Sequence, residues 1–198
     1  EPLRVGLQTC VPNTLERIAY FGKGPQENYS DRCDGAFLGL YRSTPEKFMH
    51  SYITPQENGN RCDVRWLSLT ASEAGVQFVG AEPLSVSVWN CTQESLDKAR
   101  HSNEVEPLAD ALTVNIDRTQ TGVGGTDTWS LKARPSDQYR LLEKHYACRF
   151  TIIPCNGEAE TIRNGRSLFR TNKSLQFPPS RHERQKVTEH SLRPAEIR

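Results

Sequence analysis

The sequence lacks the features that mark several large classes of protein. Its 198 residues contain 25 Lys and Arg against 24 Asp and Glu, which gives a net charge of +1. A balance this close to neutral argues against nucleic acid or an acidic membrane surface as the main partner. The chain also has no run of roughly 18 apolar residues, the length that a membrane-spanning helix needs. We therefore expect no nucleic-acid partner and no membrane partner.

Motifs for metal and redox chemistry are also missing. The chain has six cysteines with no CxxC pair and no nearby pair of histidines, at Cys10, Cys33, Cys62, Cys91, Cys148 and Cys155. Zinc sites and thioredoxin-type chemistry depend on such spacings, so we predict no metal site and no cofactor bound by this chain. Disulfides are possible, but a chain this long does not need them, and we favour free, mostly buried thiols.

Long helical patterns are scarce, and the apolar residues mostly alternate with polar ones. The alternation covers residues 5–9, 64–68, 84–88, 112–116 and 146–152, and clusters of Gly, Pro and Asn separate these segments. Alternation is typical of half-buried strands. One short helix is expected from an N-cap at Thr92 to about His101. Several strands without alternating helices predict an all-β fold, an antiparallel β-sandwich.

The composition divides the chain near residue 156. All three tryptophans and all six cysteines lie before this point, whereas residues 157–198 carry a net charge of +4 and only ten apolar side chains. Those ten show no lasting period of 2 or 3.6, and such a segment buries too little apolar surface to offset its ordering entropy. We predict one domain over residues 1–156 and a disordered or non-homologous tail over residues 157–198.

Three loop segments are rich in polar side chains. In the first, residues 24–32, a loop-structuring role is favoured for Glu27, Asn28, Asp31 and Arg32, because polar side chains in irregular loops often bond to the backbone. The second, residues 55–61, contains Glu57, Asn58, Gly59 and Arg61. It suits contact with a polyhydroxylated ligand and equally suits a plain connection between strands.

The third segment, residues 122–129, reads GVGGTDTW. It lacks the full glycine spacing of a nucleotide-binding loop and no amphipathic helix follows it, which argues against phosphate binding. The glycines, including Gly124 and Gly125, are expected to structure the loop with Asp127. The indole of Trp129 can serve as a platform for the apolar face of a sugar. Alternatively, it covers the end of the core.

Together these segments resemble motifs of the C-terminal domain of large beta-galactosidases in glycoside hydrolase family 2. Residues 21–32, FGKGPQENYSDR, resemble GRGPxENYPDR; residues 55–66, PQENGNRCDVRW, resemble PQENGNRxDVRW; and residues 122–129 resemble GxGGDDSW. Residues 35–43 are similar to a GxxLGLYRS-type stretch of the same domain. The departures are Lys23, Ser30 and Thr126. The likeness covers roughly residues 3–154 and occurs in the family's order.

The resemblance implies a fold for this chain and places the catalytic residues in another part of the enzyme. The family's domain is part of a galactose-mutarotase-like super-sandwich, and this chain is expected to lack the N-terminal side of that domain. In the family a separate catalytic barrel supplies the two glutamates of a retaining mechanism, together with magnesium and sodium. We therefore expect no catalytic residue in this chain, no activity of the chain alone, and a barrel as its partner, in the same polypeptide or as a separate subunit.

The resemblance also implies site residues. The family's counterpart of Trp129 stacks on the sugar at the mouth of the active site, beside a mobile loop that matches Glu57, Asn58, Gly59 and Arg61. The expected function is a non-catalytic part of a beta-galactosidase that acts on terminal beta-galactosides such as lactose. The parent enzyme is expected to be oligomeric and cytoplasmic, with a periplasmic location also possible.

Two other classes of function remain as alternatives. One is a free-standing carbohydrate-binding module, because a fold alone does not fix function. The other is a mutarotase-like enzyme, which needs a histidine and a carboxylate facing one sugar oxygen. Its candidate histidines are His50, His101 and His145, and none of them lies in a dense polar loop.

Overall fold

The fold is built on a curved antiparallel sheet of seven strands. The computed structural model describes residues 1–127, 129–130 and 132–174. In chain order its elements are β1 (Arg4–Pro12), β2 (Arg17–Gly24), β3 (Phe37–Ser43), α1 (Pro45–Phe48), β4 (Arg61–Thr70), β5 (Gly75–Trp89), α2 (Gln93–Lys98), η1 (Ser102–Glu104), β6 (Ala111–Gln120), η2 (Asp137–Tyr139), β7 (Phe150–Pro154) and α3 (Glu158–Ser174). The predicted all-β, antiparallel class is confirmed.

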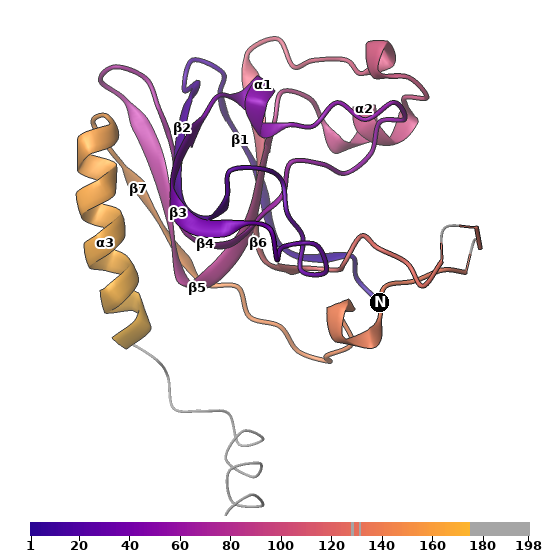
Figure 1. The fold of residues 1–198 in the computed structure, drawn as a ribbon. Helices are drawn as coiled ribbons and strands as arrows, with labels where there is room; N and C mark the ends of the chain where they lie inside the picture. Colours follow the sequence, from indigo (N-terminus) through magenta and orange to yellow (C-terminus); the bar gives the residue numbers. More distant parts are fainter. Residues whose placement is uncertain (128, 131, 175–198) are drawn as a thin grey trace, which may run out of the picture.

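The long strand β5 joins the two halves of the sheet. The strand order is β1-β6-β5-β4-β2-β3, and β7 also pairs with β5. Residues 76–80 of β5 pair with β7, whereas residues 85–89 pair with β6. The sheet curves along this strand (Figure 1), so side chains from both halves share one core. That core consists of Val11, Ile18, Tyr20, Phe48, Val64, Leu67, Leu69, Phe78, Leu84, Val86, Val88, Leu112, Val114 and Ile116.

Strand β4 is buried on both faces, and a shift in its register near its start changes which face its first residues point to. The shifts lie between Arg61 and Val64 and between Val64 and Trp66, next to Asp63 with its φ of 56°. As a result Val64 belongs to the inner core, whereas Trp66 packs with Ala19 and Val79 on the opposite face. Simple alternation would place Val64 and Trp66 on the same face. A β-bulge accounts for the difference.

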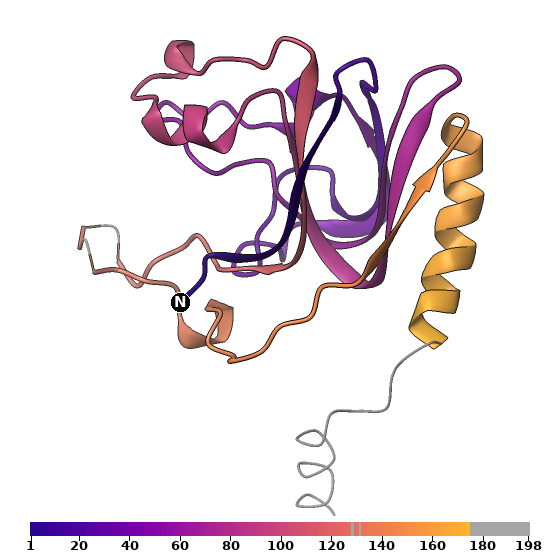
Figure 2. The ribbon, with the colours of Figure 1, turned by 180° about the vertical axis from the view of Figure 1, so that it is seen from behind.

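Helix α3 covers the face that carries Trp66. Figures 1 and 2 show it running along the outside of the sheet beside β7. Ile162, Leu168 and Phe169 pack against the outer cluster around Trp66. Gln77 Nε2 donates a hydrogen bond of 2.6 Å to the backbone oxygen of Thr161. The structure therefore differs from the disorder that the sequence predicted over residues 158–174, and the rest of that predicted tail lies outside the described residues.

Other local expectations can be checked directly. Helix α2 begins after Thr92, whose side-chain oxygen accepts the backbone N–H of Ser95, so the predicted N-cap is confirmed; the helix ends at Lys98, three residues earlier than expected. All six cysteines are free, as expected, but only Cys91 and Cys155 are buried, so the prediction that most of these thiols are buried is wrong. Among the described residues no helix is long and apolar enough to cross a membrane.

Candidate functional site

Asn28 connects the first polar loop to the second. Its side chain is buried, with 1% of the residue exposed. Its Nδ2 donates to the backbone oxygens of Lys23 (3.2 Å) and Gln26 (3.0 Å), and its Oδ1 accepts the N–H of Cys62 (2.9 Å). The backbone N–H of Asn28 bonds to the oxygen of Asn60, and Asn60 Nδ2 returns a bond to the Asn28 oxygen, both at 2.8 Å. These contacts fix residues 24–32 against the start of β4.

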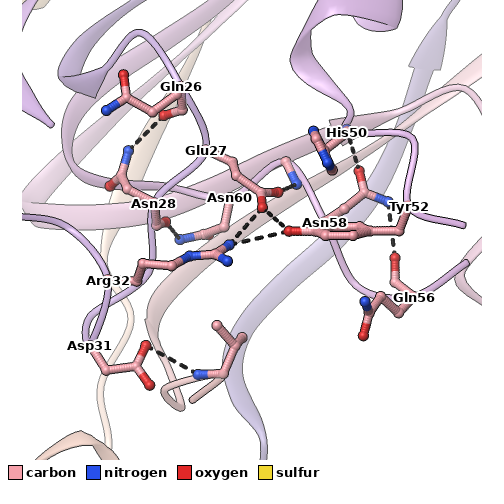
Figure 3. A network of polar contacts seen from close by, with 12 residues as sticks. Gln26, Glu27, Asn28, Asp31, Arg32, His50, Tyr52, Gln56, Asn58 and Asn60 are labelled. Carbon is pink, nitrogen blue, oxygen red and sulfur yellow. Dashed lines mark hydrogen bonds and ion pairs between the residues drawn. The ribbon is translucent and has the colours of Figure 1, made fainter. Parts of the chain in front are cut away.

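Glu27 lies at the centre of the network in Figure 3. One carboxylate oxygen accepts from Arg32 (2.6 Å) and from the Tyr52 hydroxyl, and the other accepts the N–H of Gly59 (2.7 Å). Gly59 has φ +73°, and a Cβ there would lie 2.7 Å from the Phe48 oxygen, so the loop needs glycine at this position. Because both carboxylate oxygens of Glu27 accept hydrogen bonds from the protein, Glu27 here stabilises the loops.

Asp31 connects the first loop to the third. Its carboxylate accepts the backbone N–H of Val123 (3.1 Å) and of Gly124 (2.7 Å). A Cβ on Gly122 would lie 2.4 Å from Asp31 Oδ2, so a side chain there would collide with this contact. The first segment therefore bonds to both other segments, and the three motifs form one structural unit.

The buried side chains of Asn58 and Arg61 stabilise the second loop. Asn58 is 2% exposed, and its side chain bonds to the N–H of His50 (3.1 Å) and the oxygen of Gln56 (2.9 Å). Arg61 is 3% exposed. Its Nε donates to the Tyr20 hydroxyl (3.2 Å), its Nη1 donates to two backbone oxygens of the loop, and its guanidinium lies 4.4 Å from the Phe48 ring centroid.

Glu57 belongs to a partly buried cluster of charges with Arg4 and Asp117. Arg4 contacts Glu57 at 3.2 Å and Asp117 at 2.6 Å. Burial raises the pKa of Glu57, and the Arg4 guanidinium opposes that shift; burial likewise raises the pKa of Asp117. Sequence reasoning missed Arg4 and Asp117, because 53 and 113 residues separate Arg4 from its two partners and no local motif links them.

Trp129 points into solvent. The residue is 92% exposed, which excludes the alternative in which its indole covers the end of the core. Asp127 Oδ1 accepts the backbone N–H groups of Trp129 (2.8 Å) and Ser130 (2.6 Å), and these bonds lower the pKa of Asp127. The segment that carries Trp129 extends away from the sheet in both ribbon views (Figures 1 and 2). An indole on a turn held in this way can stack on a flat apolar surface.

The first polar loop borders an open cleft. A cleft of about 660 Å³ beside the first loop is lined by Glu27, Arg32, Lys47, His50 and Tyr52 among others. His50 packs edge-on against Tyr52, with ring centroids 4.3 Å apart. His101 precedes η1, and His145 lies in the segment before β7. Among the described residues no group of three or more His, Cys, Asp or Glu could hold a metal ion.

Comparison with known proteins identifies the family. The chain is 38% identical over 149 residues to a beta-galactosidase of Vibrio cholerae, which covers 75% of this chain and 14% of that protein. It is 31% identical over 152 residues to a beta-galactosidase of Priestia megaterium (76% of this chain, 14% of that protein) and 31% over 154 residues to one of Streptococcus thermophilus (76% and 15%). The matched region thus spans about one seventh of these relatives. The family model described as the beta-galactosidase small chain matches residues 1–152, and the chain belongs to that family.

Proposed function

We propose that this chain is a non-catalytic part of a beta-galactosidase and completes the mouth of its sugar-binding site. The observation that carries the proposal is the exposed indole of Trp129 on a loop whose base is fixed by Asp31 and Asp127. An exposed aromatic side chain has no structural role in the described part of the chain, and sugars stack on such surfaces. The substrate class is terminal beta-galactosides such as lactose.

The catalytic carboxylates belong to a separate barrel in this proposal. A retaining glycosidase needs two carboxyl groups about 5–5.5 Å apart, one protonated and one ionised. Glu27 is bonded to Arg32 and Tyr52, and Arg4 lies between Glu57 and Asp117, so these carboxylates serve the fold. The chain alone is inactive, and any magnesium or sodium is held by the barrel.

The second loop contributes to the proposed sugar-binding site mainly through the shape of its backbone. Asn58, Gly59 and Arg61 set its backbone from within the fold, as their hydrogen bonds indicate. Of the three side chains predicted to contact the ligand in this loop, that of Glu57 is the most accessible, with 25% exposed, whereas Asn58 and Arg61 are buried. In the assembled enzyme, this loop and Trp129 together narrow the route to the barrel and position the second half of the substrate.

Complementation tests this function. The chain is mixed with a beta-galactosidase that lacks the matching C-terminal region, and hydrolysis of a chromogenic galactoside is measured. Recovery of activity supports the proposal, and the chain alone serves as the negative control. If the mixture stays inactive while galactose or lactose binds to the chain alone, the free-standing carbohydrate-binding module becomes the better description. Neither activity nor binding would contradict both.

A further inference from the structure

A cavity of about 350 Å³ lies between α3 and the outer face of the sheet. Its walls are mostly aromatic and aliphatic, formed by Phe21, Leu40, Trp66, Ile162, Gly165 and Phe169. This volume falls within the range of small-molecule sites, which are typically apolar with few polar groups. Helix α3 contacts the sheet closely at Gly165, where an added Cβ would lie 2.4 Å from Trp66 Cδ1. The indole of Trp66 is thus one wall of the cavity.

Two arginines complete the lining, Arg65 and Arg166. Neither forms an ion pair with a carboxylate in the part of the chain that the structure describes. Arg65 donates one bond to the backbone oxygen of Asp63, which leaves most of its five donors for another acceptor.

We propose that this cavity binds a small amphipathic carboxylate, of the class of medium-chain fatty acids. The apolar chain lies between Trp66 and Phe169, and the carboxylate bonds to Arg65 and Arg166. Guanidinium groups recognise carboxylates through paired, charge-assisted hydrogen bonds. A neutral apolar ligand would leave both cations without a counter-charge, whereas a strongly polar ligand would not fit walls of this composition.

This site is separate from the proposed sugar site. The cavity faces α3, on the opposite side of β4 from the inner core, and none of the three polar loops lines it. The family match ends at residue 152, but half of the cavity lining comes from α3. The ligand site therefore depends on a helix that the matched region does not include.

Calorimetric titration of the full chain tests the proposal, with decanoate as the probe and decanol as its neutral counterpart. We expect saturable binding, with decanoate at least about tenfold tighter than decanol because only the acid engages the guanidinium groups. Arg166→Gln should weaken decanoate binding by about tenfold and leave decanol binding unchanged. Arg163→Gln is the matched control, since Arg163 is exposed on the same helix and does not line the cavity.

A second variant tests the apolar part of the site. Ile162→Trp places a larger side chain in the cavity and should abolish binding of both probes. Urea unfolding of each variant shows whether the fold is retained; Arg166 is exposed, so its variant should unfold at the wild-type midpoint. Equal affinity for decanoate and decanol, an equal effect of Arg163→Gln, or no saturable binding to the wild-type chain would overturn the proposal.

Discussion

Two tryptophans mark two regions of the molecule that are built by different means. Trp66 is 2% exposed beneath α3, in a region held by apolar packing between the helix and the sheet. Trp129 is 92% exposed, on a loop whose backbone N–H groups bond to the carboxylates of Asp31 and Asp127. In the first region the aromatic ring stabilises the fold. In the second region the loop positions an exposed aromatic ring that contributes little to the stability of the fold.

The contrast clarifies the three motifs shared with beta-galactosidases. Most of their polar residues bond to each other's backbone, as Asn28 does with Asn60 and Asp31 with Gly124. These motifs therefore act mainly as a scaffold for the loops. Trp129 is the exception, because nothing in the described part of the chain covers its ring. Substitutions in the two regions should therefore affect stability very differently.

Trp66→Ala should lower the free energy of unfolding by about 4 kcal/mol, because it removes a large buried ring and leaves a cavity under α3. The effect is measured by urea denaturation with circular dichroism as the signal. A loss below about 1 kcal/mol would contradict the packing of α3 on the sheet.

Asn28→Ala should cost about 3 kcal/mol, because it leaves the buried N–H of Cys62 and two backbone oxygens without their side-chain partner. Gln26→Ala is the control: Gln26 is exposed and its side chain donates one bond, to the Gly35 oxygen, so a change within about 0.5 kcal/mol is expected. Equal losses in the two variants would remove the central role given to Asn28.

Gly165→Leu should lower the free energy of unfolding by about 2 kcal/mol, since the new side chain collides with Trp66 and pushes α3 away. Arg163→Leu on the exposed side of the helix serves as the comparison and should change little. Trp66 fluorescence should shift to the red only in the Gly165 variant. A Gly165 variant as stable as the wild type would mean that the helix does not rest on Trp66.

Glu57 should make a smaller contribution to the free energy of unfolding, and this contribution should depend on pH. Its pKa is raised in the folded state by burial, so the proton binds more tightly there than in the unfolded chain. The stability from this group is complete below its unfolded pKa and is lost as the pH rises through the folded pKa. Relative to Glu57→Gln, the wild type should therefore lose stability as the pH rises from the ordinary glutamate pKa of about 4.3 through the higher pKa of the folded state. A difference that is constant over this range would contradict the assignment.

Trp129→Ala should change the free energy of unfolding by no more than about 0.5 kcal/mol, because the ring contacts little else in the fold. It is also the matched control for Trp66→Ala. A larger loss would place Trp129 among the structural residues and weaken its proposed role in binding.

The sequence predicted the elements with strong local signals. Alternation located β1, β4, β5 and β6, and Thr92 gave the start of α2. The alternation predicted over residues 146–152 overlaps β7 only from residue 150, and β2 and β3 were not predicted. Helix α3 was missed because much of its inner stripe is small: Thr161 and Gly165 face the sheet together with Ile162 and Phe169, and the first two do not count as apolar. Taken together, Thr161, Ile162, Gly165 and Phe169 recur with the spacing of one face of a helix.

For the candidate site, sequence reasoning identified the loops but not the contacts between them. The local roles of Glu27 and Asn28 follow from residue type, whereas their bonds to Gly59 and Asn60 join residues 32 positions apart. The Arg4 cluster with Glu57 and Asp117 had no local signal at all. The bulge before Trp66 was equally hidden, because it depends on pairing with β5.

The most direct test of the central claim combines activity and stability for one variant. In a complemented beta-galactosidase, Trp129→Ala should reduce kcat/KM for lactose by at least about tenfold, which corresponds to about 1.4 kcal/mol of lost binding to substrate and transition state. The unfolding midpoint of the chain should stay at the wild-type value. Unchanged kcat and KM in the assembled enzyme would contradict the account.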